Sequence, residues 1–248
     1  MPNFVPMRDY TMSMIDEMIA THQLQAPFID VGCGQGAVSL HLTRRHGWDG
    51  VAADSSVGAA AAARIALRGT DVAVEERPLD QIDGVFNTVV LSTVIEHIAD
   101  DRAAVARLRT LLPEQPGAGH LVMSMPTNPD SEWRWDDDFY GHYRRYTRAS
   151  VDQLLSSSGF RLVEFWDYTF PVFWAMRRTY TRLLPAKAPA AEVKEINTAE
   201  SSLTSAWDMG TSSNLATKVP VWGLVNKAQR RFRNGDRGFE AICLAVTT

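Results

Sequence analysis

The sequence predicts an α/β fold with a mainly parallel sheet and helices on both faces. Short apolar runs alternate with helical segments from residue 28 to residue 125, and such alternation is typical of parallel strands joined by crossover helices. A loop with glycines at alternate positions separates the first apolar run from the helix that follows it. The predicted strands are 28–31, 50–54, 71–75, 85–91, 120–125, 160–169 and 239–246, and the predicted helices include 11–25, one that begins at Ala37, 56–68 and 151–159.

The glycine loop has the spacing G-x-G-x-G, formed by Gly32, Gly34 and Gly36. Glycines let the backbone turn tightly and leave no Cβ between the main chain and a ligand, and the helix from Ala37 directs its free N–H groups at the loop. The spacing differs from the G-x-G-x-x-G of dinucleotide sites, and no Lys-Ser/Thr pair follows it as in a P-loop. The alternative is an ordinary strand–turn–helix in which the glycines only allow the chain to turn and bind no ligand.

Two carboxylates accompany this loop. Asp30 precedes it, and Asp54 ends the second predicted strand, about 20 residues further on, where a ribose-binding acid is expected in such folds. A carboxylate there can accept charge-assisted hydrogen bonds from both ribose hydroxyls. Taken alone, Asp54 would more simply cap the helix at 56–68, but its register with Asp30 and the glycines favours the ribose role.

Together these residues resemble motif I of the class I S-adenosylmethionine-dependent methyltransferases, D/E-x-G-x-G-x-G. The resemblance implies a Rossmann-like, seven-stranded sheet whose last strand is antiparallel, with S-adenosylmethionine as cofactor. The chain departs from the family at Asn87, where Asp is usual, and near Glu76 and Arg77, where an Asp usually meets the adenine amino group. The residues expected to bind the cofactor are Asp30, Gly32, Cys33, Gly34, Gly36, Asp54, Ser55, Ser92 and Glu96.

A Glu-His pair, Glu96 and His97, follows the fourth predicted strand. It resembles a pair that lies beside the methionine end of the cofactor in many small-molecule methyltransferases. The alternative is that His97 is a residue at a helix start, hydrogen-bonded to the backbone. Cys33 is expected to fill space in the glycine loop rather than to act as a nucleophile, because no histidine is near it in sequence.

Residues 126–147 are rich in aromatic side chains and are expected to form a loop, because they contain too many Pro, Asp and Gly for a regular element. A long loop of this kind is typical of a functional site. Its portion at 141–147 resembles a G-H-x-R-x-Y pattern that forms part of the wall around the transferred methyl group in one subgroup of the family. By that resemblance His142, Arg144 and Tyr146 face the site; alternatively the rings only pack the loop and its arginines pair with the acidic run at 136–138. The expected substrate-binding residues are Trp133, Trp135, Tyr140, Tyr143 and Arg144.

Methyl transfer requires alignment of donor and acceptor, and removal of a proton when the acceptor is a hydroxyl or a protonated amine. A histidine suits that step because its unperturbed pKa lies near neutrality. His142 is the first candidate for the base, His97 the second, and Tyr146 is a further catalytic candidate. A carboxylate or thiolate acceptor would need no base, and His142 would then only position the substrate. No metal site is expected, because the sequence shows no metal-ligand spacing. In particular, the three consecutive aspartates at 136–138 are expected in a loop, which by itself is not a chelating arrangement.

The segment 170–237 exceeds what the minimal fold needs. Two stretches of it, 171–184 and 221–233, are predicted to be amphipathic helices, separated by 185–189 and by the Ser/Thr-rich 198–217. We expect the insertion to cap the substrate or to form a homodimer contact rather than to dock on a membrane, since each basic stretch is short. The predicted domains are a methyltransferase domain at 1–169 and 238–248 and a helical insertion at 170–237.

The composition is that of an ordinary globular protein, with 45% hydrophobic and 22% charged residues among 248. Residues 1–141 carry 10 Lys/Arg against 20 Asp/Glu, whereas residues 142–248 carry 15 against 9. Residues 1–141, which contain the expected cofactor site, are thus acidic. This argues against nucleic acid as the substrate, because contacts with phosphate groups supply much of a protein's affinity for nucleic acid. Two cysteines argue against a disulfide framework. Without a recognisable secretion signal or a long apolar run, a cytoplasmic protein with no stable membrane insertion is expected.

The sequence therefore predicts methyl transfer to an O or N atom of a small, apolar or aromatic metabolite, and by analogy a place in specialised metabolism. A lipid- or quinone-directed methyltransferase is a close alternative. A rival of another class is a binding or regulatory protein that keeps the cofactor pocket without methyl transfer, or that uses it for a different reaction.

Overall fold

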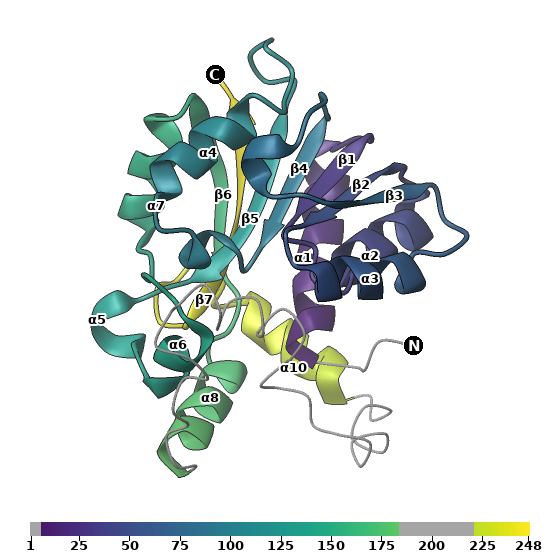
Figure 1. The fold of residues 1–248 in the computed structure, drawn as a ribbon. Coiled ribbons are helices and arrows are strands. Elements are labelled where there is room, and N and C mark those ends of the chain that lie inside the picture. Colours follow the sequence, from purple (N-terminus) through teal and green to yellow (C-terminus); the bar gives the residue numbers. More distant parts are fainter. Residues whose placement is uncertain (1–5, 184–220) are drawn as a thin grey trace.

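A computed structural model describes residues 6–183 and 221–248 of the chain. At its centre is a seven-stranded sheet in the order β3-β2-β1-β4-β5-β7-β6 (Figure 1). The strands are β1 (Phe28–Val31), β2 (Gly50–Asp54), β3 (Val72–Glu76), β4 (Thr88–Ser92), β5 (His120–Pro126), β6 (Phe160–Asp167) and β7 (Glu240–Thr247). All seven strands predicted from the sequence are present.

The direction of each strand follows from its pairing. β1 is parallel to β2 and β4, β3 is parallel to β2, and β5 is parallel to β4. β7 is antiparallel to both of its neighbours, β5 and β6, so it is the one reversed strand of the sheet. The chain order switches between β1 and β4, and ligands of such sheets bind outside the carboxyl ends of the strands at this point.

Helices cover both faces of the sheet (Figure 1). One face carries α1 (Pro6–His22), α2 (Ala37–His46) and α3 (Val57–Ala66). The other face carries α4 (Asp101–Arg109) and α7 (Arg148–Ser156). Two short 3₁₀ turns, η1 (Leu79–Gln81) and η2 (Ile95–His97), follow β3 and β4. Val89 and Leu91 pack with the α4–α7 side, whereas Val90 packs with the α1–α2 side. This alternation is typical of strands buried on both faces.

Several predicted boundaries shift for local reasons. The first helix begins earlier than expected, at Pro6. α7 begins at Arg148 because the hydroxyl of Thr147 caps it and accepts the N–H of Ser150 at 3.1 Å. β4 begins only at Thr88, after Asn87 has used its side-chain amide to donate to the carbonyl of Ala26 at 2.5 Å. The Asp that is usual in the family could not donate this hydrogen bond.

The expectation that residues 126–147 contain no regular element is wrong. The segment holds two short helices, α5 (Pro129–Glu132) and α6 (Trp135–Tyr140). The three aspartates at 136–138 lie in the first turn of α6, where carboxylates interact favourably with the helix dipole. Asp137 also accepts the backbone N–H of Arg134 at 2.8 Å, and Gly141 ends the helix in the left-handed conformation. Acidic residues and glycine therefore delimit a helix here.

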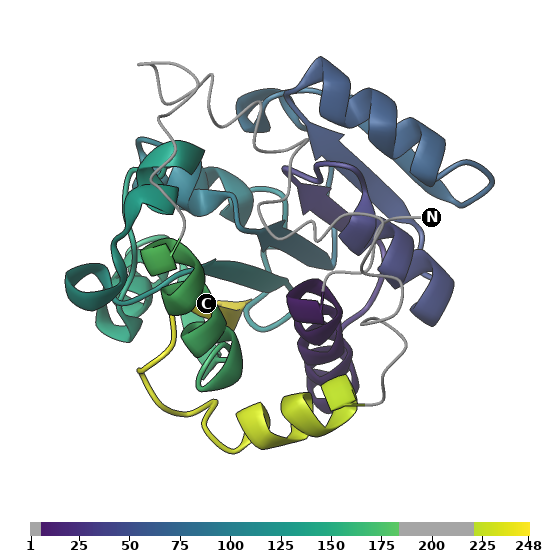
Figure 2. The same ribbon diagram turned by 90° about the horizontal axis from the view of Figure 1, so that it is seen from below.

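Two helices lie between β6 and β7 in the described part of the chain, α8 (Val172–Leu183) and α10 (Val221–Arg230). Figure 2 shows both of them near α1, at the end of the sheet that faces the viewer. Phe173 of α8 stacks on Trp222 of α10 with ring centroids 6.0 Å apart, and it also contacts Tyr10 of α1. The predicted linkers 185–189 and 198–217 lie outside the described residues. Within the described ranges, no helix combines the length and apolar character needed to cross a bilayer.

Candidate functional site

The glycine loop connects the carboxyl end of β1 to α2, which begins at Ala37 as predicted. All three glycines of the loop have positive φ, between 54° and 76°, a conformation that other residues rarely adopt. A Cβ on Gly32 would lie 2.5 Å from Cγ2 of Val94, so the loop packs directly against the turn after β4. The N–H groups of Gly32 and Cys33 donate to the carbonyl of Ala53 at 2.8 and 3.0 Å. The loop is therefore held between β2 and β4.

Asp30 fixes the loop from the protein interior. The residue is 1% exposed, and its Oδ2 accepts hydrogen bonds from the N–H and the hydroxyl of Ser39 at 3.2 and 2.7 Å. Burial raises the pKa of Asp30 to about 6, although the two hydrogen bonds from Ser39 oppose the shift. The carboxyl group thus links β1 to α2 on the buried side of the glycine loop.

Asp54 joins the glycine loop to the end of β2. Its Oδ2 accepts the N–H of Gly34 at 2.9 Å, and its Oδ1 accepts the N–H of Ser56 at 2.8 Å. Burial raises the pKa of Asp54 above its ordinary value. The helix cap that the sequence offered as an alternative role for Asp54 is supplied by Ser56, whose hydroxyl accepts the N–H of Ala59 at the start of α3.

The other predicted cofactor residues of the loops differ in their exposure. Ser55 is exposed, and the hydroxyl of Ser92 lies 3.1 Å from that of Ser124. Cys33 is buried, and burial raises the pKa of its thiol far above the usual range. A raised pKa disfavours the thiolate form that a nucleophilic cysteine needs.

Glu96 and His97 belong to η2, directly after β4. Glu96 is 1% exposed, and burial raises the pKa of its carboxyl group well above its ordinary value. Its Oε2 has no hydrogen-bond partner among the described residues. His97 is half-buried, and burial together with the nearby His142 lowers the pKa of its imidazole to about 3.

His142 follows α6 and meets the same turn from the opposite side. The ring centroids of His97 and His142 are 4.8 Å apart in an edge-to-face arrangement, and the ring of Tyr140 stacks near His142 at 6.1 Å. Nδ1 of His142 lies 2.8 Å from Oδ1 of Asp137. Because an ionised carboxylate only accepts, Nδ1 is the donor in this hydrogen bond. The structure thus brings together two predicted segments that are distant in sequence.

Asp137 is the centre of a buried ion-pair network. Its pair with Arg145 matches the sequence-based alternative in which arginines of this segment pair with residues 136–138, whereas its pair with Arg177 was not predicted. Asp137 is 1% exposed, and its carboxylate accepts from Arg145 at 2.8 Å and from Arg177 of α8 at 3.0 Å. Burial alone would raise the pKa of Asp137, but the hydrogen bond from His142 and the charges of both arginines outweigh it and hold the pKa below its ordinary value. Arg177 also binds Asp136, so α8 is tied to α6 and, through Asp137, to His142.

Arg144 and Tyr146 connect the 141–147 segment to the start of α4. The guanidinium of Arg144 lies 3.0 Å from Oδ2 of Asp101 and donates to the carbonyl of Ile98. Tyr146 is buried and donates its hydroxyl to Asp101 at 3.1 Å, while the N–H of Tyr143 donates to the Glu96 carbonyl at 2.8 Å. The hydrogen bonds of Arg144, Tyr146 and Tyr143 hold the 141–147 segment in place beside η2.

Two predicted tryptophans lie on the outer side of the same region. The indole N–H of Trp133 lies 3.3 Å from Oδ1 of Asp138, and the ring is partly exposed. Trp135 donates to the carbonyl of Thr181 in α8 at 3.1 Å and packs near Tyr180, with ring centroids 5.7 Å apart. Trp135 therefore supports the contact between α6 and α8.

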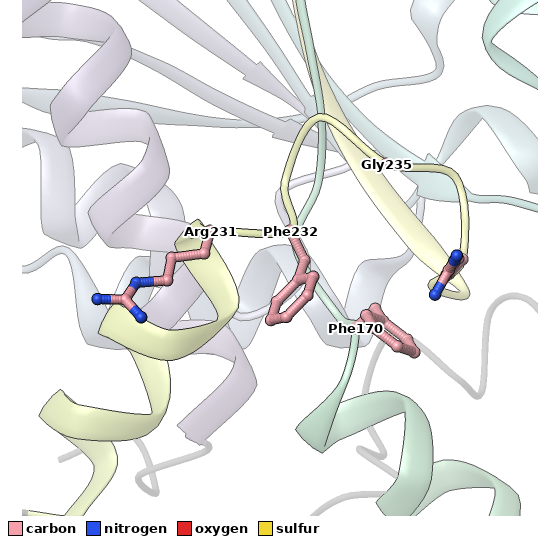
Figure 3. Close-up of a pocket in the computed structure, with 5 residues that line it drawn as sticks. Phe170, Arg231, Phe232 and Gly235 are labelled. Atoms are coloured by element: carbon pink, nitrogen blue, oxygen red, sulfur yellow. The ribbon is translucent and has the colours of Figure 1, made fainter.

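A hollow of about 310 Å³ lies elsewhere, between the end of β6 and the segment before β7 (Figure 3). It is lined by Phe170, Arg231, Phe232, Gly235 and Arg237. Figure 3 shows the rings of Phe170 and Phe232 close together, with centroids 5.4 Å apart. None of the residues that line it belongs to the glycine loop or to the cluster around His142.

Replacement of Asp30 by Asn should change the pH dependence of stability. The folded-state pKa of Asp30, about 6, lies above its ordinary value of 3.8, so the folded chain binds this proton more tightly than the unfolded chain. The stabilisation is fully present below about pH 4 and is lost as the pH rises through 6, an effect of up to about 3 kcal/mol.

Urea unfolding at several pH values measures this difference. Relative to the wild type, Asp30→Asn should become more stable as the pH rises from about 4 to 7. Asp83→Asn, at a side chain that is 90% exposed, is the control. Parallel pH profiles for wild type and Asp30→Asn would contradict the assigned pKa.

Gly32→Ala should destabilise the fold by about 1–3 kcal/mol, because it adds backbone strain and a clash with Val94. Gly47→Ala is a matched control, since Gly47 has a similar φ of 69° but no atom within 4 Å of an added Cβ. Thermal unfolding should show a larger loss for the variant at Gly32. Equal losses would mean that the contact with Val94 is not tight.

Residues 7–165 of the chain match a family model described as a methyltransferase domain. No curated protein matches the chain significantly. Its fold is similar to magnesium protoporphyrin IX methyltransferase from Synechocystis PCC 6803 with bound S-adenosylmethionine, at 15% identity and a TM-score of 0.54, covering 100% of this chain and 86% of that one.

Two further solved structures share the fold. Geranyl diphosphate C-methyltransferase from Streptomyces coelicolor A3(2) matches at 14% identity and a TM-score of 0.59, covering 95% of this chain and 76% of that one. The cyclase SpnF matches at 16% identity and a TM-score of 0.57, covering 95% of this chain and 80% of that one. Such identities show the fold alone. The family match covers more than half of the sequence, and the chain therefore belongs to the methyltransferase-domain family.

Proposed function

We propose that the protein transfers a methyl group from S-adenosylmethionine to an oxygen or nitrogen atom of a small, apolar or aromatic acceptor. Membership of the methyltransferase family supports the class of reaction. The observation that carries the proposed site is the contact between its two halves: the glycine loop packs on Val94, two residues before Glu96. Donor-binding and acceptor-binding groups thus share the crevice at the carboxyl ends of β1 and β4.

The donor side consists of a backbone cradle and one carboxylate. Glycines with positive φ allow a ligand close to the main chain, and α2 starts directly behind them. Each oxygen of Asp54 accepts one backbone N–H and retains a lone pair for a ribose hydroxyl. S-adenosylmethionine supplies an electrophilic methyl group on a sulfonium. The chain holds this group in line with the acceptor atom.

On the acceptor side, we assign to His142 the role of the base that removes the proton of the acceptor. Its Nδ1 is bound to Asp137, so Nε2 is the atom that takes a proton, and the carboxylate stabilises the resulting imidazolium. Bound S-adenosylmethionine would supply the methyl group to the acceptor atom, and the proton that this atom loses would pass to Nε2 of His142. His97, held neutral by burial, faces the same space.

Aromatic rings and α8 favour an apolar acceptor in a covered site. Tyr140 stacks near His142, and Phe139 packs on Tyr140. Arg177 ties α8 to α6 by hydrogen bonds to Asp136 and Asp137. These contacts support the role of a substrate cap for the insertion that contains α8. Exclusion of water by a cap strengthens the electrostatic interactions within the site.

Donor binding is the first test of this function. In calorimetry the wild type should bind S-adenosylmethionine and S-adenosylhomocysteine. Asp54→Asn should bind both at least tenfold more weakly, because a hydrogen bond to a charged group contributes about 1.5–3 kcal/mol. Asp83→Asn, which changes an exposed carboxylate, should bind like the wild type. The absence of binding by the wild type would overturn the proposal.

Product detection is the second arm of the same test. Mass spectrometry against a panel of phenols, amines and carboxylic acids should reveal a methylated product. Donor binding without any product would favour a protein that keeps the pocket for another purpose. Methylation only of quinones or lipids presented in vesicles would favour the lipid-directed alternative.

His142→Gln should lower kcat by about 100-fold or more, because it removes the group that takes the acceptor's proton. Its affinity for S-adenosylhomocysteine should stay unchanged, since the donor is bound by other residues. His120→Gln is the control, because His120 lies at the amino end of β5, the opposite edge of the sheet. Wild-type turnover in His142→Gln would remove this residue from the mechanism.

A further inference from the structure

Three side chains at the acceptor side have a geometry suited to a metal ion. Glu96, His97 and His142 each offer one ligand atom, and these atoms lie within 4.8 Å of one another. Glu96 and His97 are neighbours in η2, whereas His142 approaches from the end of α6. Metal–ligand bonds of about 2.0–2.2 Å place neighbouring ligand atoms about 3–4 Å apart, so small side-chain movements bring this cluster to coordination distance.

Glu96 provides an independent observation. The residue is 1% exposed, and its Oε2 has no hydrogen-bond partner within the described ranges. Buried polar atoms are almost always satisfied, and an unpaired carboxylate oxygen in the interior is strongly unfavourable. The methyl transfer proposed above gives this carboxylate no role. A cation between Glu96 and the two imidazoles would satisfy it.

The surroundings of His142 match those of a metal ligand. A histidine that binds a metal almost always donates its other ring N–H to a carboxylate or a carbonyl. Here Nδ1 of His142 lies 2.8 Å from Oδ1 of Asp137, so an ion at this cluster would be bound through Nε2. Arg145 and Arg177 hold Asp137 in place, so the orientation of the imidazole is fixed before an ion arrives.

We propose that Glu96, His97 and His142 bind one divalent transition-metal ion, with Zn²⁺ as the ion that fits best. Two imidazoles and one carboxylate are the ligands of catalytic zinc sites, which keep a further position open. Mg²⁺ and Ca²⁺ prefer oxygen ligands throughout, so the two imidazoles disfavour them. The sequence shows no metal-ligand spacing here, because His142 lies 45 residues after His97 and only the fold brings the three side chains together.

The open position on the ion would take the nucleophilic atom of the acceptor. This role in the reaction rests on the proposed function, whereas the binding of the ion is independent of it. An ion there would lower the pKa of a coordinated acceptor hydroxyl group, so that this hydroxyl would lose its proton to bulk water before methyl transfer. Nε2 of His142 is a ligand in that state. Its assignment as a base applies to the metal-free protein.

A second cluster, formed by Asp16, His41 and His46, serves as an internal control. Its ligand atoms are also close together, but Oδ1 of Asp16 lies 2.7 Å from Nε2 of each histidine, and Arg45 lies 3.9 Å from Oδ2. These hydrogen bonds and the nearby arginine already satisfy the carboxylate. We therefore assign no ion to this cluster.

The test uses the full chain after removal of metal with a chelator. Calorimetric titration with Zn²⁺ should show one ion per chain, and Co²⁺ should give visible d–d absorption on binding. Glu96→Gln and His142→Gln should each weaken binding at least tenfold. His41→Gln should bind like the wild type, and Mg²⁺ should bind much more weakly than Zn²⁺.

Two results would overturn the proposal. One is the absence of saturable Zn²⁺ binding by the wild type. The other is binding that His41→Gln abolishes and Glu96→Gln leaves unchanged, which would place the ion at the second cluster. Thermal unfolding establishes whether each variant is folded, and His97→Gln replaces Glu96→Gln if the latter is not.

The metal and the methyl transfer can fail separately. Zn²⁺ titration needs neither donor nor acceptor. Donor binding by the chelator-treated protein tests the cofactor side without an ion. Loss of Zn²⁺ binding with intact donor binding would therefore reject the metal site and leave the proposed function standing.

Discussion

The buried negative charge of Asp137 is the interaction on which the acceptor side of the site depends. A carboxylate without access to water must be compensated by cations and hydrogen bonds, and Arg145, Arg177 and His142 supply them. Loss of one cation from such a network costs more than the intact pair contributes, because an uncompensated charge is left inside. The main effect of the network is therefore to position groups rather than to stabilise the fold. It fixes the orientation of the His142 ring and, through Asp137, links this ring to Arg177 of α8.

The donor side rests on a different kind of interaction. It uses main-chain groups and contacts between elements adjacent in the sheet: glycines of positive φ, the N–H of Gly34 on Asp54 and Ser39 on Asp30. Each depends on residues at a short distance in sequence or on neighbouring strands. No charge from α8 enters these contacts, so changes in the insertion can alter the acceptor side without dismantling the glycine loop.

This difference explains how much the sequence could predict. The strands were predictable because each is a short apolar run, and the glycine loop and Asp54 because their spacing is local. The helices α5 and α6 were missed because Pro, Asp and Gly were read as loop signals, whereas the carboxylate of Asp137 begins α6 and Gly141 ends it. The pairing of Asp137 with Arg177 joins residues far apart in sequence, and no spacing rule indicates it.

The same reasoning bears on what similarity to known proteins can reveal. Donor recognition follows from local sequence, so a family model can match it in a chain that shares only 14–16% of its residues with solved structures of the same fold. In the function that we propose, acceptor recognition depends on how η2, α6 and α8 meet, and ion pairs of Arg177 with Asp136 and Asp137 join α8 to α6. Fold and donor are therefore shared widely while the acceptor differs. The identity of the acceptor must be sought in the contacts around His142, where three segments of the chain meet.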